Sequence, residues 1–144
     1  MAVNFPQGVV LDTNIVLDLL VFSDPASHPL LQALQAGSLQ WLATPAMRDE
    51  LQRVLGYPQI APRLAYYRLA PAQVLAQYDQ CVQQVDVAPR AAMVCKDPDD
   101  QKFIDLAVAH RSLLLSKDQA VLRLAKRLLA AGVRAQAAFS PAAG

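Results

Sequence analysis

The chain has 144 residues, of which 54% are hydrophobic and 17% are charged, and its formal net charge is +1. This length suits one compact domain that buries about two-thirds of the surface of its unfolded chain, and the composition excludes a disordered tail or a strongly basic protein that coats nucleic acid. Two cysteines without a C-x-x-C pair, and only two histidines, exclude a zinc ribbon and a disulfide scaffold.

No segment of the sequence has the composition of a membrane span or of a leader. The apolar runs fall well short of the roughly 20 residues needed to cross a bilayer. The opening residues, MAVNFPQG, lack the basic and apolar regions of a signal peptide. We therefore expect a cytoplasmic protein that does not contact a membrane.

The first part of the chain alternates short apolar runs with helical periodicity. The run VVLD at 9–12 predicts a buried strand that stops at an acid, and a helical pattern follows it directly. Glycines and a Thr-Pro pair mark where later elements begin and end. In chain order these signals predict a strand over 9–12, helices over 13–22 and 28–37, a strand over 39–43 and a helix over 45–55.

The rest of the chain continues this alternation, with short helical pieces between the prolines of 57–71. The remaining elements are expected as helices over 71–84, 98–110 and 118–131 and strands over 85–89, 91–95, 112–116 and 133–139. Strands that alternate with helices imply a parallel sheet covered on both faces. We therefore predict an α/β fold with three layers, α/β/α, around a parallel sheet of four to five strands.

Two acids follow predicted strands. Asp12 ends the strand at 9–12, and Asp118 comes two residues after Ser116, where the strand at 112–116 ends. Open α/β sheets place their functional sites at the carboxyl ends of the strands. Both carboxylates are therefore candidates for one shared site.

Two further acids lie on helix faces that should be apolar. Glu50, the only glutamate among the twelve acids, lies three residues after Met47 and four before Val54. Asp100 precedes Phe103 by three residues on its own helix. At about 100° per residue, both carboxylates point toward the sheet. An ionised carboxylate on an inward face is costly unless a positive group meets it.

The four acids, once brought to one edge of the sheet, would repel one another and raise their pKa values unless a divalent cation neutralised them. A ligand set of hard oxygens suits Mg²⁺ or Mn²⁺ and not Zn²⁺. Such a cation activates water and shields the charge that builds on phosphorus during phosphodiester hydrolysis. We therefore expect a metal-binding, catalytic set made of Asp12, Glu50, Asp100 and Asp118.

Four segments carry these acids in order: VVLDTNIV, the helix with Glu50, DPDDQKFIDLAVAH and LLLSKDQAVL. Together they resemble the PIN-domain ribonucleases over nearly the whole chain, in particular the branch that forms the toxins of type II (VapBC-like) toxin–antitoxin pairs. In that family an Asp ends the first strand, a helical Glu follows the second strand, an Asp opens a helix with the pattern D-x-x-[IF], and a last Asp follows [ST]-x. The matching positions here are Asp12, Glu50, Asp100 and Asp118.

The resemblance implies a Rossmann-like PIN nuclease domain over residues 1–140, with a frayed tail at 141–144, and an endoribonuclease that depends on Mg²⁺ or Mn²⁺. It implies a toxin with RNA as substrate, a small cognate antitoxin as protein partner and a homodimer. It also implies that Asn14 and Ser116 orient ligands or the scissile phosphate. The chain departs from the family pattern at Lys117, where relatives often carry Gly or Arg.

Simpler explanations and other functions stay open on the sequence alone. Asp97 is a further supporting candidate for the site, although its place before Pro98 is also that of an ordinary helix N-cap. A PIN-like module without catalytic activity would bind RNA or a protein. A HAD-like phosphatase also has an Asp at the end of its first strand, but it needs a second Asp two residues later, where this chain has Asn14.

Overall fold

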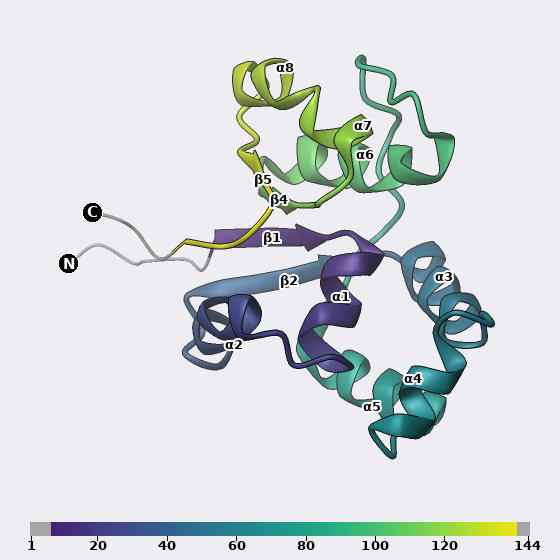
Figure 1. Ribbon diagram of the computed structural model, residues 1–144. Coiled ribbons are helices and arrows are strands. Elements are labelled where there is room, and N and C mark those ends of the chain that lie inside the picture. The colour runs from purple at the N-terminus through teal and green to yellow at the C-terminus, as the bar shows by residue number, and fades with distance from the viewer. Residues whose placement is uncertain (1–6, 141–144) are drawn as a thin grey trace.

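The computed structural model describes residues 7–140, which form an open five-stranded sheet with helices on both faces (Figure 1). The strand order is β3-β2-β1-β4-β5, and every neighbouring pair is parallel. The strands are β1 (Gln7–Leu11), β2 (Leu39–Ala43), β3 (Val82–Gln84), β4 (Leu113–Leu115) and β5 (Ala135–Gln136). The predicted α/β fold with four to five parallel strands is confirmed.

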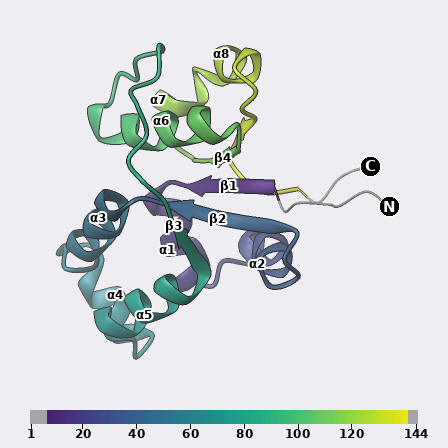
Figure 2. The same ribbon diagram turned by 180° about the vertical axis from the view of Figure 1, so that it is seen from behind.

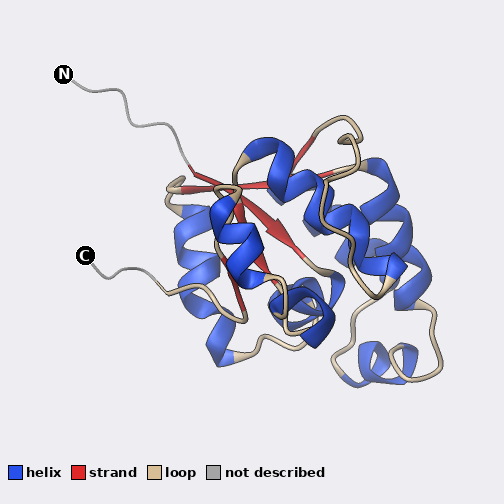
Figure 3. Cartoon of the chain, turned by 90° about the horizontal axis from the view of Figure 1, so that it is seen from above, coloured by secondary structure: helices blue, strands red, loops and turns tan. Residues whose placement is uncertain are grey.

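Two groups of helices enclose the sheet, as opposite views show (Figure 1, Figure 2). One group is α1 (Thr13–Leu20), α2 (His28–Gln35), α3 (Pro45–Leu55), α4 (Ala61–Tyr66) and α5 (Pro71–Cys81), and the other is α6 (Gln101–His110), α7 (Gln119–Leu122) and α8 (Ala125–Ala130). Short 3-10 turns, η1 (Pro25–Ser27) and η2 (Pro98–Asp100), precede α2 and α6. Seen from above, the strands twist among the helices (Figure 3). The three predicted layers are therefore present.

The central strands are apolar because both of their faces are buried. Val9, Val10 and Leu114 have no exposed surface, and Val10 pairs in register with Leu114. Trp41 on β2 packs edge-on against Tyr78 of α5, with 5.0 Å between the ring centroids. The parallel backbone pairing of β1 with β4 holds these two strands side by side, so the residues that follow them lie together at the carboxyl edge of the sheet.

The strand order reverses between β1 and β4. From β1 the chain proceeds to β2 and β3 on one side, whereas β4 and β5 lie on the other side. The carboxyl ends of the strands at such a reversal form a binding crevice in α/β proteins. Asp12 directly follows β1, and its backbone N–H donates to the carbonyl of Leu115 at the end of β4 (3.0 Å). Asp12 and Asp118 therefore flank this crevice.

The segment between α5 and α6 differs from the prediction. The helix expected over 71–84 ends at Cys81, and residues 82–84 form β3, which pairs with β2. The strands expected over 85–89 and 91–95 are wrong, because both segments are irregular. The chain leaves the sheet after Val85, whose backbone N–H still donates to the carbonyl of Ala43 on β2 (2.9 Å). Side chains of α6 bond to the backbone of 91–95 instead.

The elements after β4 are shorter than predicted. The helix expected over 118–131 is split into α7 and α8. The split coincides with a turn at Leu124 and with the carbonyl of Ala120, which accepts the thiol of Cys95 (3.6 Å). The edge strand expected over 133–139 is confined to β5.

No helix within residues 7–140 is long and apolar enough to cross a membrane. The start of the domain expected over 1–140 and the frayed tail expected at 141–144 lie outside the described residues, and both stay predictions.

Candidate metal centre

A cleft of about 340 Å³ opens at the carboxyl ends of β1 and β4, where the strand order reverses. All four acids that the sequence singled out line it, alongside polar, basic and aromatic side chains from α1, α3 and α6. The acidic lining residues are Asp12, Glu50, Asp99, Asp100 and Asp118. The structure thus brings the four predicted acids to one cavity from four separate segments of the chain.

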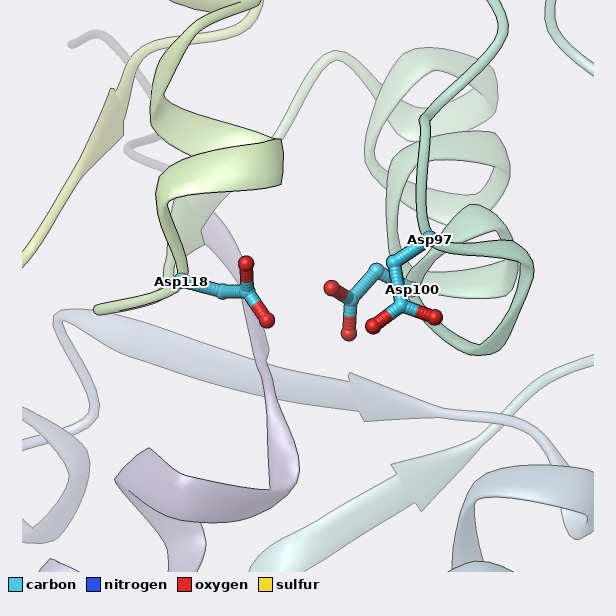
Figure 4. Close-up of side chains that lie close together, drawn as sticks. All are labelled: Asp97, Asp100 and Asp118. Atoms are coloured by element: carbon cyan, nitrogen blue, oxygen red, sulfur yellow. The ribbon is translucent and has the colours of Figure 1, made fainter.

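Three aspartates, here called the aspartate cluster, lie close together: Asp97, Asp100 and Asp118. Each offers a carboxylate oxygen, and these oxygens all lie within 4.8 Å of one another. In Figure 4 the side chain of Asp118 points toward those of Asp100 and Asp97. Asp97 and Asp118 are also N-caps, because each accepts the backbone N–H of the residue two positions later (3.0 and 2.8 Å). Asp97 is therefore both the N-cap of η2 and a member of the aspartate cluster.

Asp100 is the most perturbed acid of the aspartate cluster. The residue is 9% exposed, and its Oδ2 atom is buried without a hydrogen-bond partner among the described residues. Burial, followed by the contact with Asp118, raises the pKa of Asp100 to about 7. A cation stabilises a buried carboxylate oxygen that lacks a donor and lies beside another carboxylate.

Asp12 is buried and hydrogen-bonded on both carboxylate oxygens. Its Oδ1 caps α1 by accepting the backbone N–H of Asn14 (2.8 Å), and its Oδ2 accepts the hydroxyl of Ser116 (2.6 Å). Burial raises the pKa of Asp12, and these hydrogen bonds oppose the rise. Ser116 also accepts the backbone N–H of Asp118 (3.1 Å). The hydroxyl of Ser116 therefore connects Asp12, which follows β1, to Asp118, which follows β4. Asp12 itself is not a member of the aspartate cluster.

Glu50 lies on α3, and both of its carboxylate oxygens are engaged. Oε1 is 2.6 Å from the ammonium of Lys102, and Oε2 accepts the hydroxyl of Thr13. Lys102 also donates to the carbonyl of Asp99 (2.6 Å). The side chain of Glu50 is only 15% exposed, in agreement with the inward face expected from its helical phase. Sequence reasoning missed Thr13 and Lys102 as its partners, because no local pattern relates them to α3.

Two residues near the cleft lie apart from the aspartate cluster. Asn14 is exposed and lines the cleft, and its backbone N–H donates to the carboxylate of Asp12, the N-cap of α1. Lys117, the departure from the family pattern, pairs with Asp18 on α1 and not with Asp118. The positive charge of Lys117 is therefore already matched outside the aspartate cluster.

The loop that carries Asp97 is held by two side chains of α6 that the sequence did not identify. Gln101 accepts the backbone N–H of Cys95 (2.7 Å), and Asp105 accepts that of Ala91 (2.8 Å). These bonds satisfy backbone groups that strand pairing would otherwise satisfy. In the sequence both residues look like ordinary polar positions of a helix, so no signal marked them.

The donor set of the cleft fits a hard divalent cation. Within residues 7–140, the grouped ligand atoms are carboxylate oxygens, and no histidine or cysteine joins them. Cys95 is buried, and its thiol donates to a backbone carbonyl. Sets made only of oxygen suit Mg²⁺ or Mn²⁺, and Oδ2 of Asp100 is an acceptor that such an ion would satisfy.

A family model described as PIN domain matches residues 8–120 of the chain. Among solved structures, the chain is similar to one described as the crystal structure of VapBC2 from Rickettsia felis bound to a DNA fragment from their promoter. The match covers 90% of this chain and 97% of the other, with a TM-score of 0.59 and 13% sequence identity, so the likeness concerns the fold. No curated protein matches the chain in sequence.

The matched region runs from β1 into α7 and contains all five acids that line the cleft. PIN domains are generally nucleases. The match also removes the HAD-like phosphatase from the alternatives. Because residues 8–120 make up well over half of the 144 residues, the chain belongs to the PIN domain family.

Proposed function

We propose that this chain is a Mg²⁺- or Mn²⁺-dependent endoribonuclease that hydrolyses RNA phosphodiester bonds in the acidic cleft, and that it is the toxin of a toxin–antitoxin pair. The observation that carries the nuclease proposal is the buried Oδ2 of Asp100, which has no hydrogen-bond partner among residues 7–140 and belongs to a carboxylate beside those of Asp97 and Asp118. Nuclease activity is general in the PIN family, which also supports the proposal that this chain is a nuclease.

The proposed metal ligands come from the aspartate cluster and the acids beside it. Asp100 and Asp118 are the central ligands, and Asp97 is the third carboxylate of the cluster. Asp12 and Glu50 line the same cleft and complete the catalytic set of acids. When bound, the cation supplies an activated water molecule and offsets the negative charge that develops on the phosphate.

The chain's own side chains hold these groups in position before substrate arrives. Ser116 fixes the carboxylate of Asp12 and the backbone of Asp118 through one hydroxyl. Thr13 and Lys102 fix Glu50 at another wall of the cleft. Asn14, which is exposed and lines the cleft, is placed to orient the scissile phosphate. Groups held in this way need little rearrangement in the transition state.

Thermal unfolding with added metal tests the site without knowledge of the RNA target. Mn²⁺ or Mg²⁺ at ~100 times its Kd should stabilise the wild type by about 2.7 kcal/mol. The double variant Asp12→Asn/Asp100→Asn should begin more stable without metal, because like-charge repulsion is removed, and it should not respond to metal. Asp49→Asn, at an exposed acid of α3, is the matched control and should respond like the wild type. A flat wild-type response would contradict the metal site.

RNA cleavage by the metal-loaded protein tests the activity itself. The wild type and Asp49→Asn should cut single-stranded RNA in Mn²⁺, whereas Asp100→Asn and Asp118→Asn should be slower by roughly 100-fold or more. DNA of the same sequence is included to test the preference for RNA. If the wild type binds both metal and RNA but cuts nothing, the chain is a PIN-like binding module without catalysis.

The protein partner that we propose is a small antitoxin that covers the cleft and places a basic side chain in it. The acidic lining supports a basic partner, and the similar fold is that of VapBC2 crystallised with promoter DNA. Co-expression with the product of the neighbouring gene should yield a complex that no longer cuts RNA. Recovery of the chain alone, with its cleavage undiminished, would contradict this partner.

The assembly that we propose is a cytoplasmic homodimer, for which the resemblance to the family is the support. Light scattering of the purified chain should give about twice its mass of 15.6 kDa. A mass that stays at 15.6 kDa at all concentrations would contradict the dimer.

A further inference from the structure

A second cavity, of about 480 Å³, adjoins the acidic cleft on the side of α1 and α4. Asn14 lines both cavities. Lys117 lines the second cavity, and the next residue along the chain, Asp118, lines the first. The two cavities are therefore neighbours.

Flat side chains form one wall of this second cavity. The guanidinium carbon of Arg63 on α4 lies 3.7 Å from the ring centroid of Phe22, just beyond the end of α1. The ring of Tyr67 lies 6.3 Å from that of Phe22, centroid to centroid, and is tilted from it by 49°, and the residue is 42% exposed. Because Arg63 is also exposed, the wall presents a guanidinium plane and an aromatic ring to a bound group.

The charges of the second cavity are balanced. Its two basic residues, Arg63 and Lys117, are matched by two acids, Asp18 and Asp24. Lys117 is paired with Asp18, and Asp24 caps the turn η1. A balanced cavity with flat walls suits an uncharged planar ring better than a phosphate, whereas the acidic cleft beside it suits a cation and the phosphate that the cation holds.

We propose that the second cavity is a stacking subsite for an unpaired nucleobase, next to the phosphate held at the acidic cleft. Unpaired bases of the strand stack on the guanidinium of Arg63 and on the tilted ring of Tyr67, as bases of single strands do on guanidinium groups and aromatic rings. The inference rests on the proposed nuclease function, because the strand in the subsite is the one cut in the cleft. Since paired bases are stacked within a duplex, the subsite selects single-stranded regions.

A partner protein is the competing occupant, because arginine and tyrosine are also common at protein interfaces. Two observations favour the nucleobase. The cavity adjoins a cleft whose carboxylates fit a metal ion, and the two share the lining residue Asn14. Its two basic and two acidic residues give it no net charge, so it does not favour an oppositely charged protein surface.

The test measures the binding of a fluorescein-labelled uridine octamer by fluorescence anisotropy, in EDTA and in the Asp100→Asn background, where no cleavage occurs. Arg63→Lys keeps the positive charge but removes the planar guanidinium group. Tyr67→Leu keeps an apolar side chain but removes the aromatic ring. Each should weaken binding by roughly fivefold or more, the lower end of what one stacked base contributes. Arg127→Lys, at an exposed arginine of α8, is the matched control and should bind like its parent.

An octamer of ribose phosphates without bases separates stacking from contact with the strand backbone. On this abasic probe, Arg63→Lys should bind as tightly as its parent, because the charge is kept and no ring is present to stack. A loss on the abasic probe equal to that on the uridine octamer would overturn the subsite and would make Arg63 a phosphate contact.

The remaining outcomes separate this inference from the nuclease proposal. Equal binding of the uridine octamer by all variants, or no binding by the parent, overturns the subsite and leaves the cavity as a contact surface for a partner protein. Wild-type cleavage in Mn²⁺ together with equal binding overturns the subsite alone. Weaker binding by Arg63→Lys and Tyr67→Leu, with no cleavage by the wild type, supports the subsite and overturns the nuclease.

Discussion

The ammonium of Lys102 lies 2.6 Å from Oε1 of Glu50, although 52 residues separate the two in sequence. The pair joins α6 to α3 at the acidic cleft, and the hydroxyl of Thr13 occupies the other carboxylate oxygen of Glu50. Within the described residues, no basic side chain pairs with a member of the aspartate cluster. The protein thus neutralises Glu50 with the side chain of Lys102, whereas the carboxylates of the aspartate cluster have no basic partner among the described residues.

Replacement of Lys102 by methionine should lower the stability of the metal-free protein and raise its affinity for Mn²⁺. Glu50 would lose an ion-pair partner in a half-buried position, at a cost of about 1–3 kcal/mol. The cleft would also become more negative, which favours a cation. Urea unfolding in EDTA measures the first effect and calorimetric titration with Mn²⁺ the second, with Lys102→Arg as the control that keeps the pair. Weaker binding of Mn²⁺ by Lys102→Met would contradict the prediction.

The raised pKa of Asp100 should make the metal-free protein less stable as pH rises from about 4 to about 7. The folded pKa is about 7 against an ordinary value of 3.8, so in this range the folded state keeps a proton that the unfolded state has released. Stability therefore falls with rising pH, by at most about 1.4 kcal/mol per pH unit for one proton. Burial raises the pKa of Asp12 as well, which acts in the same direction.

Thermal unfolding in EDTA across this pH range, on the wild type and on Asp100→Asn, checks the effect. The variant should vary less with pH and should exceed the wild type in stability at neutral pH, while the two should converge near pH 4. Saturating Mn²⁺ should reverse the wild-type trend, because the metal binds the deprotonated carboxylates. If both proteins instead gain stability equally toward neutral pH in EDTA, the pKa of Asp100 is not raised.

The residues of the site that the sequence identified depend on local patterns. Asp12 and Asp118 follow apolar runs that are strands in the structure, and a residue after a parallel strand lies at the carboxyl edge of the sheet whatever the rest of the chain does. Glu50 and Asp100 were found from their phase on a helix, which is also local. The helix expected over 45–55 agrees with α3 at both ends, because Pro45 and Gly56 mark them.

The features that the sequence missed depend on contacts between distant segments. Whether an apolar run becomes a strand depends on tertiary contacts, and the backbone of residues 91–95 is bonded by side chains of α6 in place of a neighbouring strand. The partner of Glu50 was missed for the same reason, because only the folded chain brings Lys102 to it.

Ser116→Ala should destabilise the protein by about 1–3 kcal/mol, because it leaves a buried oxygen of Asp12 without its donor. It should also weaken Mn²⁺ binding, since the same hydroxyl accepts the backbone N–H of Asp118 and so holds the end of β4. Ser112→Ala, at a buried serine just before β4 whose hydroxyl donates to the carbonyl of Leu113, is the matched control. It should leave Mn²⁺ affinity unchanged. Equal Mn²⁺ affinities for both variants would show that Ser116 has no part in positioning the site.

Gln101 holds the loop that carries Asp97, so Gln101→Leu should weaken metal binding although no ligand is changed. Its buried side chain accepts the N–H of Cys95 (2.7 Å) and donates to the carbonyl of Met93 (3.1 Å). Leucine is similar in size but pairs with neither group, at a cost of about 1–3 kcal/mol, so amide hydrogen exchange in this loop should accelerate roughly tenfold or more. Gln32→Leu, at an exposed position of α2, is the control and should change neither exchange nor Mn²⁺ affinity. Faster exchange with unchanged Mn²⁺ affinity would remove Asp97 from the ligands, because a released loop no longer holds its carboxylate at the aspartate cluster.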